Sequence, residues 1–72
     1  MDQANKETRD RLNRDATRAR QDADARRDAA QSSISRRHFV AASHELARAA
    51  EYEATYQALL HAAYMVDVEA SA

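Results

Sequence analysis

The sequence predicts an all-α protein in which two long helices fold back on each other as an antiparallel hairpin. Its 72 residues include no glycine and no proline, the residues that most often form turns and loops. Alanine, which has the highest intrinsic helix propensity, recurs every few positions. Apolar residues also repeat at the three- and four-residue spacing of one helix face. We therefore expect a single helical domain over residues 1–72.

The first helix is expected over about residues 2–31. Its surface is dominated by charge, and many opposite charges lie four residues apart, such as Glu7–Arg11 and Asp10–Arg14. Each pair of this kind stabilises an isolated helix by about 0.2–0.5 kcal/mol. At the helical period, one narrow apolar stripe remains, formed by Leu12, Ala16, Ala19, Ala23, Ala30 and Ile34.

A turn is expected at about residues 32–35, where three serines lie close together. Serine hydroxyls cap the free amide groups of a helix N-terminus. On one continuous helix, Ile34 would point about 130° away from Phe39 and Leu46, so a straight rod could not bury both stripes. However, the capping box and the C-cap glycine are both absent, which leaves one continuous helix as the alternative to a hairpin.

The second helix, expected over about residues 35–68, is broadly apolar. Towards its C-terminal end, Leu59, Met65 and Val66 extend the apolar surface to a second side. A helix that is apolar on more than one side needs more than one neighbour. We therefore expect assembly into a coiled-coil bundle or docking on a larger partner. The main apolar face comprises Phe39, Ala42, Leu46, Ala49, Tyr56, Leu60, Tyr64 and Val68.

The two halves also differ in charge. Residues 1–37 include ten basic and seven acidic residues, whereas residues 38–72 include one basic and five acidic residues. Opposite net charges favour antiparallel contact between the halves, an effect that is modest at physiological salt. The excess of arginine over lysine, together with the alanine content, is typical of a GC-rich genome such as that of an actinobacterium or its phage.

Catalytic and metal chemistry find little support. There is no cysteine, and His38, His44 and His61 are too widely spaced to place two ligands on one helix face. Ser43, His61 and Asp67 contain the residue types of a hydrolase triad, but nothing supplies the strained turn and oxyanion donors of such sites. We therefore expect no enzyme activity, no cofactor, no metal and no small-molecule substrate.

Glu53 interrupts the apolar face of the second helix. One interpretation is an acid that serves a ligand or a proton. The favoured one is a polar group that sets register or partner choice by requiring a counterpart. An arginine from the basic half is the expected counterpart, because an unpaired buried charge is costly.

The tyrosines of the second helix fit either a recognition patch or large core residues with hydroxyl groups at the rim. In an oligomer the two interpretations merge. The expected partner interface, for self-association or for a larger protein, comprises Phe39, Leu46, Tyr52, Glu53, Tyr56, Leu59, Leu60, Tyr64 and Met65.

Nucleic-acid binding is the alternative function. Arg26, Arg27, Arg36 and Arg37 are the candidate contacts, although acidic residues interrupt the basic surface. Membrane binding is not expected, because the longest mostly apolar stretch, residues 58–66, is too short to span a bilayer. Since residues 1–5 are too polar for a signal peptide, we expect a cytoplasmic protein.

Overall fold

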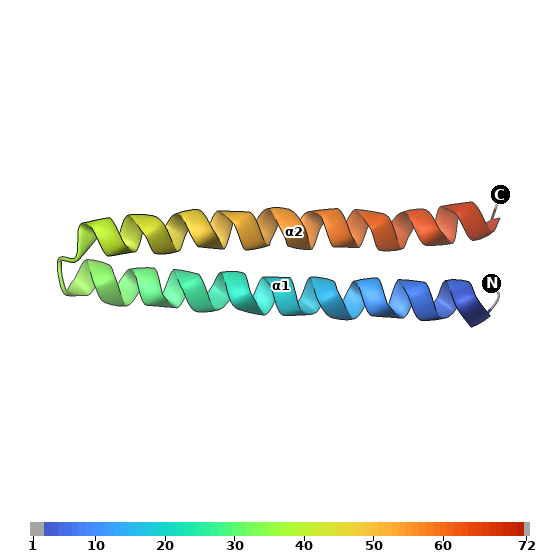
Figure 1. Ribbon diagram of the computed structural model, residues 1–72, viewed down its shortest axis with the longest axis horizontal. Helices are drawn as coiled ribbons and strands as arrows, with labels where there is room; N and C mark the ends of the chain where they lie inside the picture. The colour runs from blue at the N-terminus through green and yellow to red at the C-terminus, as the bar shows by residue number, and fades with distance from the viewer. Residues whose placement is uncertain (1–2, 72) are drawn as a thin grey trace.

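The computed structural model describes residues 3–71 as two helices packed side by side, α1 (Gln3–Ser35) and α2 (Phe39–Ser71) (Figure 1). Each helix has 33 residues, and the molecule is 53 Å long, close to the ~50 Å expected at 1.5 Å per residue. The chain reverses direction between the helices, so the N-terminal end of α1 lies beside the C-terminal end of α2 (Figure 1). The all-α antiparallel hairpin is confirmed, and the alternative of one continuous helix is wrong.

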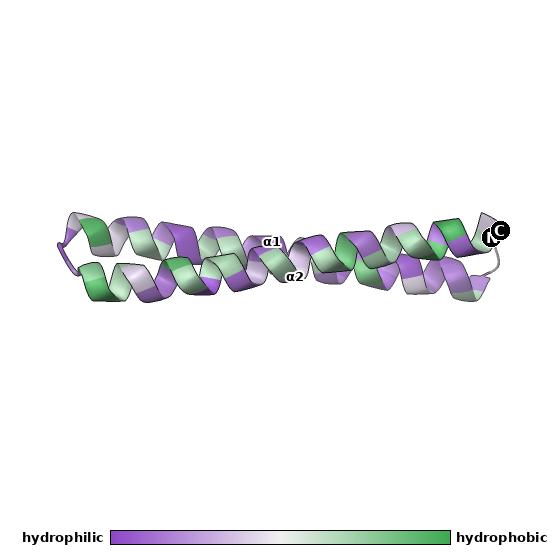
Figure 2. Cartoon of the chain, turned by 90° about the horizontal axis from the view of Figure 1, so that it is seen from above, coloured by the Kyte–Doolittle hydropathy of each residue, from purple (hydrophilic) through white to green (hydrophobic). Residues whose placement is uncertain are grey.

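The helices meet along a seam with the spacing of a coiled coil. In each helix, residues withdrawn from solvent alternate at intervals of three and four, the heptad pattern of helices that wind around each other. Seen from above, the two helices cross near the middle of their length (Figure 2). The α1 seam comprises Arg9, Leu12, Ala16, Ala19, Ala23, Arg26, Ala30 and Ser33. The α2 seam comprises Ala42, Glu45, Ala49, Tyr52, Tyr56, Leu59, Ala63 and Val66.

Alanine alone forms the fully buried part of this seam. Across residues 3–71, every buried side chain is an alanine, and Ala23 and Ala30 are 0% exposed. In the register set by the contact between Arg20 and Tyr56, alanines of one helix lie at the level of larger residues of the other. Small side chains let the two backbones approach closely. The buried set is Ala16, Ala19, Ala23, Ala30, Ala42, Ala49 and Ala63.

The turn is a Schellman motif without its usual glycine. The amide of His38 donates to the carbonyl of Ser33 (2.7 Å), and the amide of Arg37 donates to the carbonyl of Ile34 (2.9 Å). These are the two bonds of that motif, and they require a left-handed residue at the position of Arg37. Arg37 adopts a φ of 62°, a conformation that costs a residue with a β-carbon about 1–2 kcal/mol.

The predicted turn position was wrong by several residues. The serine-rich segment 32–35 forms the last turn of α1, and the chain reverses at residues 36–38 instead. No serine caps α2; the carbonyl of His38 accepts its first helical bond, from the amide of Ala42 (3.0 Å). Both helices therefore end later than residues 31 and 68. The predicted start at Asp2 lies outside the described residues.

Candidate interaction surface

α2 carries a second heptad stripe that the hairpin leaves uncovered. We define the outer stripe as Phe39, Ser43, Leu46, Ala50, Glu53, Gln57, Leu60 and Tyr64, again at intervals of four and three. Each of its positions follows a seam position or the N-cap by one residue, which places it about 100° around the helix from the seam. Its large apolar side chains reach solvent: Phe39 is 62% exposed, Leu46 48% and Tyr64 63%. Phe39, Leu46 and Tyr64 of the stripe are therefore apolar side chains that α1 leaves uncovered.

The packing divides the main apolar face predicted for α2. Phe39, Leu46, Tyr64 and Val68 of that face are exposed. Ala42 and Ala49 of the same face are buried in the hairpin, together with Ala63. Ile34 was likewise expected in the α1 stripe, and it is 40% exposed.

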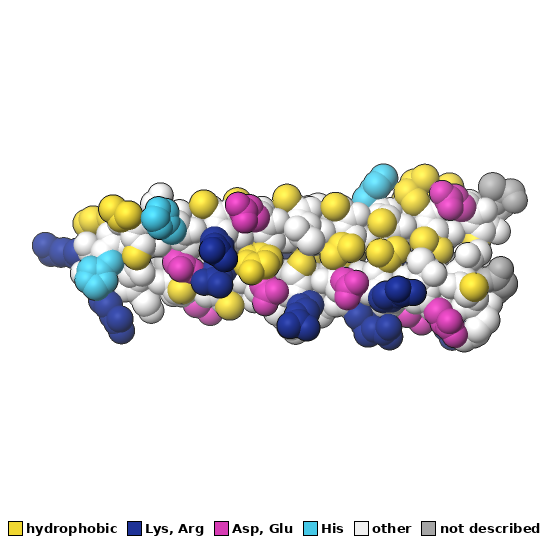
Figure 3. Space-filling view, viewed as in Figure 1, with side chains coloured by type: hydrophobic (Ala, Val, Ile, Leu, Met, Phe, Trp, Pro, Cys, Tyr) yellow, Lys and Arg dark blue, Asp and Glu magenta, His cyan; other side chains and the backbone are white. Residues whose placement is uncertain are grey.

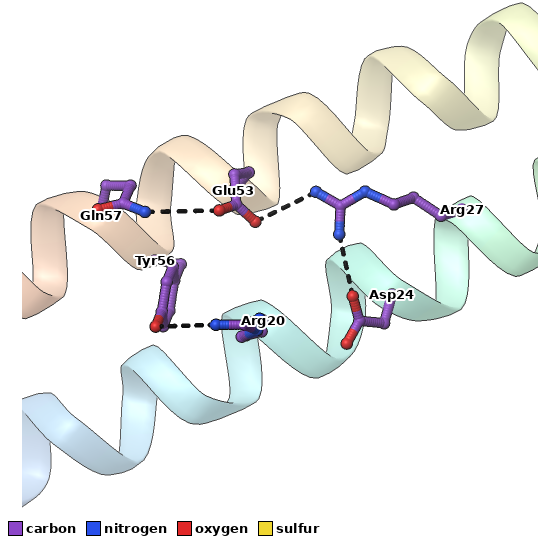
Figure 4. A network of polar contacts seen from close by, with 6 residues as sticks. All are labelled: Arg20, Asp24, Arg27, Glu53, Tyr56 and Gln57. Carbon is purple, nitrogen blue, oxygen red and sulfur yellow. Dashed lines mark hydrogen bonds and ion pairs between the residues drawn. The ribbon is translucent and has the colours of Figure 1, made fainter.

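A polar network lies at the centre of the outer stripe (Figure 4). Arg27 of α1 donates from Nη2 to Glu53 Oε2 (3.2 Å) and from Nη1 to Asp24 (2.9 Å). Gln57 Nε2 donates to the other oxygen of Glu53 (3.5 Å). The hydrogen bond from Arg27 lowers the pKa of Glu53 below its ordinary value. Arg27 is thus the basic counterpart that the sequence led us to expect, and Glu53 lies beside the seam, with its side chain 37% exposed.

Tyr56 extends this network towards α1. Arg20 Nη1 donates to the Tyr56 hydroxyl (3.2 Å), and the guanidinium carbon lies 5.3 Å from the centre of the ring. The hydrogen bond to Tyr56 raises the pKa of Arg20. This combination of hydrogen bond and cation–π contact holds Tyr56 in the hairpin seam.

The predicted interface residues therefore separate into three groups. Tyr52, Tyr56 and Leu59 lie in the intramolecular seam, where they are half-buried. Met65 is 36% exposed on another side of α2. The residues that the outer stripe brings together are Phe39, Leu46, Glu53, Leu60 and Tyr64.

Two further ion pairs join the helices. Arg26 Nη1 donates to Glu45 (3.1 Å), which raises the pKa of Arg26, and Arg9 Nη1 donates to Asp67 (3.4 Å). Sequence reasoning missed both pairs, because their signal, opposite charges at matching levels, becomes visible only once the register is known. Figure 3 shows charged side chains flanking hydrophobic ones along the boundary between the helices.

The four candidate nucleic-acid contacts differ in what they touch. Arg26 and Arg27 bridge to acids of α2, whereas Arg36 and Arg37 are exposed at the turn. Within residues 3–71 there is no pocket, no metal-ligating group of three or more side chains, and no helix long and apolar enough to cross a membrane.

Comparisons with protein-family models, curated proteins and solved structures found no match.

Proposed function

We propose that this chain is a non-catalytic protein–protein interaction module that assembles through the outer stripe of α2. It self-associates and binds a larger protein, as a small regulator, inhibitor, adaptor or assembly component. The observation that carries the proposal is the mismatch between core and surface. The hairpin buries only alanines among its described residues, while Phe39, Leu46 and Tyr64 remain exposed.

The energetic reason is the apolar area left in water. Covering a large apolar side chain contributes about 1.5–3 kcal/mol, and the outer stripe holds several of them in a row. An alanine seam contributes much less per residue because each methyl group is small. A partner helix laid along the outer stripe would supply the burial that α1 does not, as in helical bundles and helix-in-groove complexes.

Nucleic-acid binding receives less support from the contacts. Phosphate binding needs basic side chains that are free to reach the backbone of the nucleic acid. Arg26 and Arg27 instead donate to Glu45 and Glu53. A contact made by the exposed pair Arg36 and Arg37 alone is small, so the geometry favours a protein partner.

The test compares two double-lysine variants that place the added charges on different sides of α2. Leu46→Lys/Leu60→Lys alters the outer stripe, and His44→Lys/Ala58→Lys places two lysines at the same spacing on an exposed side away from it. Sedimentation velocity at micromolar concentration measures self-association, and circular dichroism checks that each variant is helical. Co-sedimentation with candidate protein partners measures binding to other chains.

The proposal expects wild type and the His44→Lys/Ala58→Lys control to form complexes that the outer-stripe variant loses. Equal behaviour of all three helical proteins would refute the role of the outer stripe. A complex lost only in the control would move the interface to the opposite side of α2.

A further inference from the structure

We infer that the outer stripe is covered by a second copy of this chain, with the two α2 helices packed antiparallel about a two-fold axis at the level of Thr55. This inference rests on the proposed function and names its partner. In such a dimer, two hairpins form a four-helix bundle with α2 against α2 at its centre. The surface would be isologous, so each residue meets the residue equally far from the axis in the other direction.

Between Leu46 and Tyr64, the polarity of the outer stripe is palindromic about Thr55. Phe39 lies outside this segment, at the level of the partner's Ser71. Two residues on either side of Thr55 lie the polar Glu53 and Gln57. Five residues away lie the apolar Ala50 and Leu60, a small side chain against a large one. Nine residues away lie Leu46 and Tyr64, which are both apolar and exposed. An antiparallel pair centred here therefore matches polar with polar and apolar with apolar.

The central pair is complementary in hydrogen bonding as well. Gln57 Nε2 reaches Glu53 of its own helix at 3.5 Å, a long contact that uses one of its two N–H groups. The other N–H faces the partner's Glu53 in the inferred register. The carboxylate of Glu53 is already paired with Arg27 of its own hairpin at 3.2 Å, so covering it buries no unpaired charge (Figure 4).

Other arrangements of two α2 helices match less well. Parallel packing sets Glu53 directly against the partner's Glu53, which opposes two like charges. If the two-fold axis is moved half a heptad along α2 towards the turn, the antiparallel pair sets Leu46 against the partner's Gln57 and Ala50 against the partner's Glu53. If the axis is moved half a heptad towards the C-terminal end, Glu53 lies against the partner's Tyr64. Each places a polar group against an apolar one.

The side of α1 next to the stripe suits the edge of such an interface. Arg20, Asp24 and Arg27 lie there with their polar groups bonded to neighbours in the same hairpin. Charged residues are typical of the rim of an interface. The α2 helices would then meet along the outer stripe, with Glu53 and Gln57 near the axis, and the α1 residues would form the rim.

The absence of cysteine makes a clean crosslinking test possible. The experiment mixes two full-length single-cysteine variants, Leu46→Cys and Tyr64→Cys, carrying different tags, and treats them with a short thiol-specific crosslinker. In the inferred dimer these positions lie opposite each other. Two copies of residue 46 lie about 27 Å apart along the axis, because 18 residues separate their levels. His44→Cys mixed with Tyr64→Cys is the matched control, because His44 is exposed on another side of α2.

The expected result is a crosslinked pair that carries both tags, with no product from either variant alone and none from the control mixture. A Leu46→Cys product with itself would indicate parallel packing and overturn the inference. Loss of complexes in Leu46→Lys/Leu60→Lys without the mixed product would also overturn it, while leaving the proposed function intact. A monomeric wild type whose complexes ignore the outer stripe would overturn both.

Discussion

Replacing Arg37 with glycine should stabilise the hairpin. Arg37 has a φ of 62°, and the β-carbon of a non-glycine residue costs about 1–2 kcal/mol there. Glycine removes that cost, but it gives back about 0.4–1 kcal/mol because it frees the unfolded chain. The difference between these two effects is a net gain in the free energy of unfolding of about 0–1.6 kcal/mol, with a midpoint near 0.8 kcal/mol. For a domain of this size, 1 kcal/mol raises the melting temperature by roughly 4–8 °C.

The assay is thermal unfolding by circular dichroism at one fixed protein concentration, because association also shifts the melting temperature. Two controls separate the backbone effect from the charge. Arg36→Gly alters the neighbouring residue, whose amide still donates to Ser32 in helical fashion (3.1 Å), and should lower stability by about 0.5–1 kcal/mol. Arg37→Ala removes the charge and keeps the β-carbon, so it should gain little. A melting temperature for Arg37→Gly at or below that of Arg36→Gly would refute the reasoning.

Three further measurements probe the seam, the polar network and the alternative function. Ala23→Leu should lower the free energy of unfolding, measured in urea, by about 1–3 kcal/mol, because Ala23 is 0% exposed and has no room for a larger side chain. Ala25→Leu, on the exposed side of α1, should change it little. Equal effects of the two variants would contradict the tight alanine seam. Because Arg27 lowers the pKa of Glu53 in the folded chain, this pair should contribute stability above the ordinary pKa of 4.5 and lose it as the pH falls through the lowered value. Glu53→Gln should therefore weaken the acid dependence of the melting temperature, and an unchanged profile would mean that the pair contributes nothing. Titration with duplex DNA at about 0.15 M salt should show no tight binding. The nucleic-acid alternative would be supported instead by tight binding that is lost in Arg36→Gln/Arg37→Gln. Its binding constant should also fall by about 0.9 log units per log unit of salt for each phosphate contacted.

The buried face of α1 was largely predictable from the sequence alone. Its seam contains Ala16, Ala19, Ala23 and Ala30, the only narrow apolar row on a helix otherwise covered by charge. Where one row alone is apolar, periodicity identifies the buried face. Ile34 departs from this agreement because the seam alternates steps of three and four residues, so Ser33 and not Ile34 follows Ala30 in it.

α2 was harder because two heptad rows overlap on it, one residue apart. The sequence placed both rows on one broad apolar face and did not say which row would pack against α1. The hairpin uses the row with alanines, because the alanines of α1 allow close approach and fit the small residues and tyrosines of that row. Hydrophobicity alone does not tell which of the two rows packs against α1, because that depends on how the side chains fit together. The outer stripe could therefore be identified only from the packing.

The sequence by itself determined an all-helical chain and favoured a hairpin over one continuous helix without deciding between them. Missing glycine and proline, abundant alanine and opposite charges in the two halves are local or summed properties, and they do not depend on register. Tertiary structure decided the rest: the turn at residues 36–38, the pairing of Arg27 with Glu53, and which face of α2 stays open. Each of these depends on the level at which the two helices meet. That level is set by the fit of alanines against larger side chains across the whole seam, which no single stretch of sequence contains.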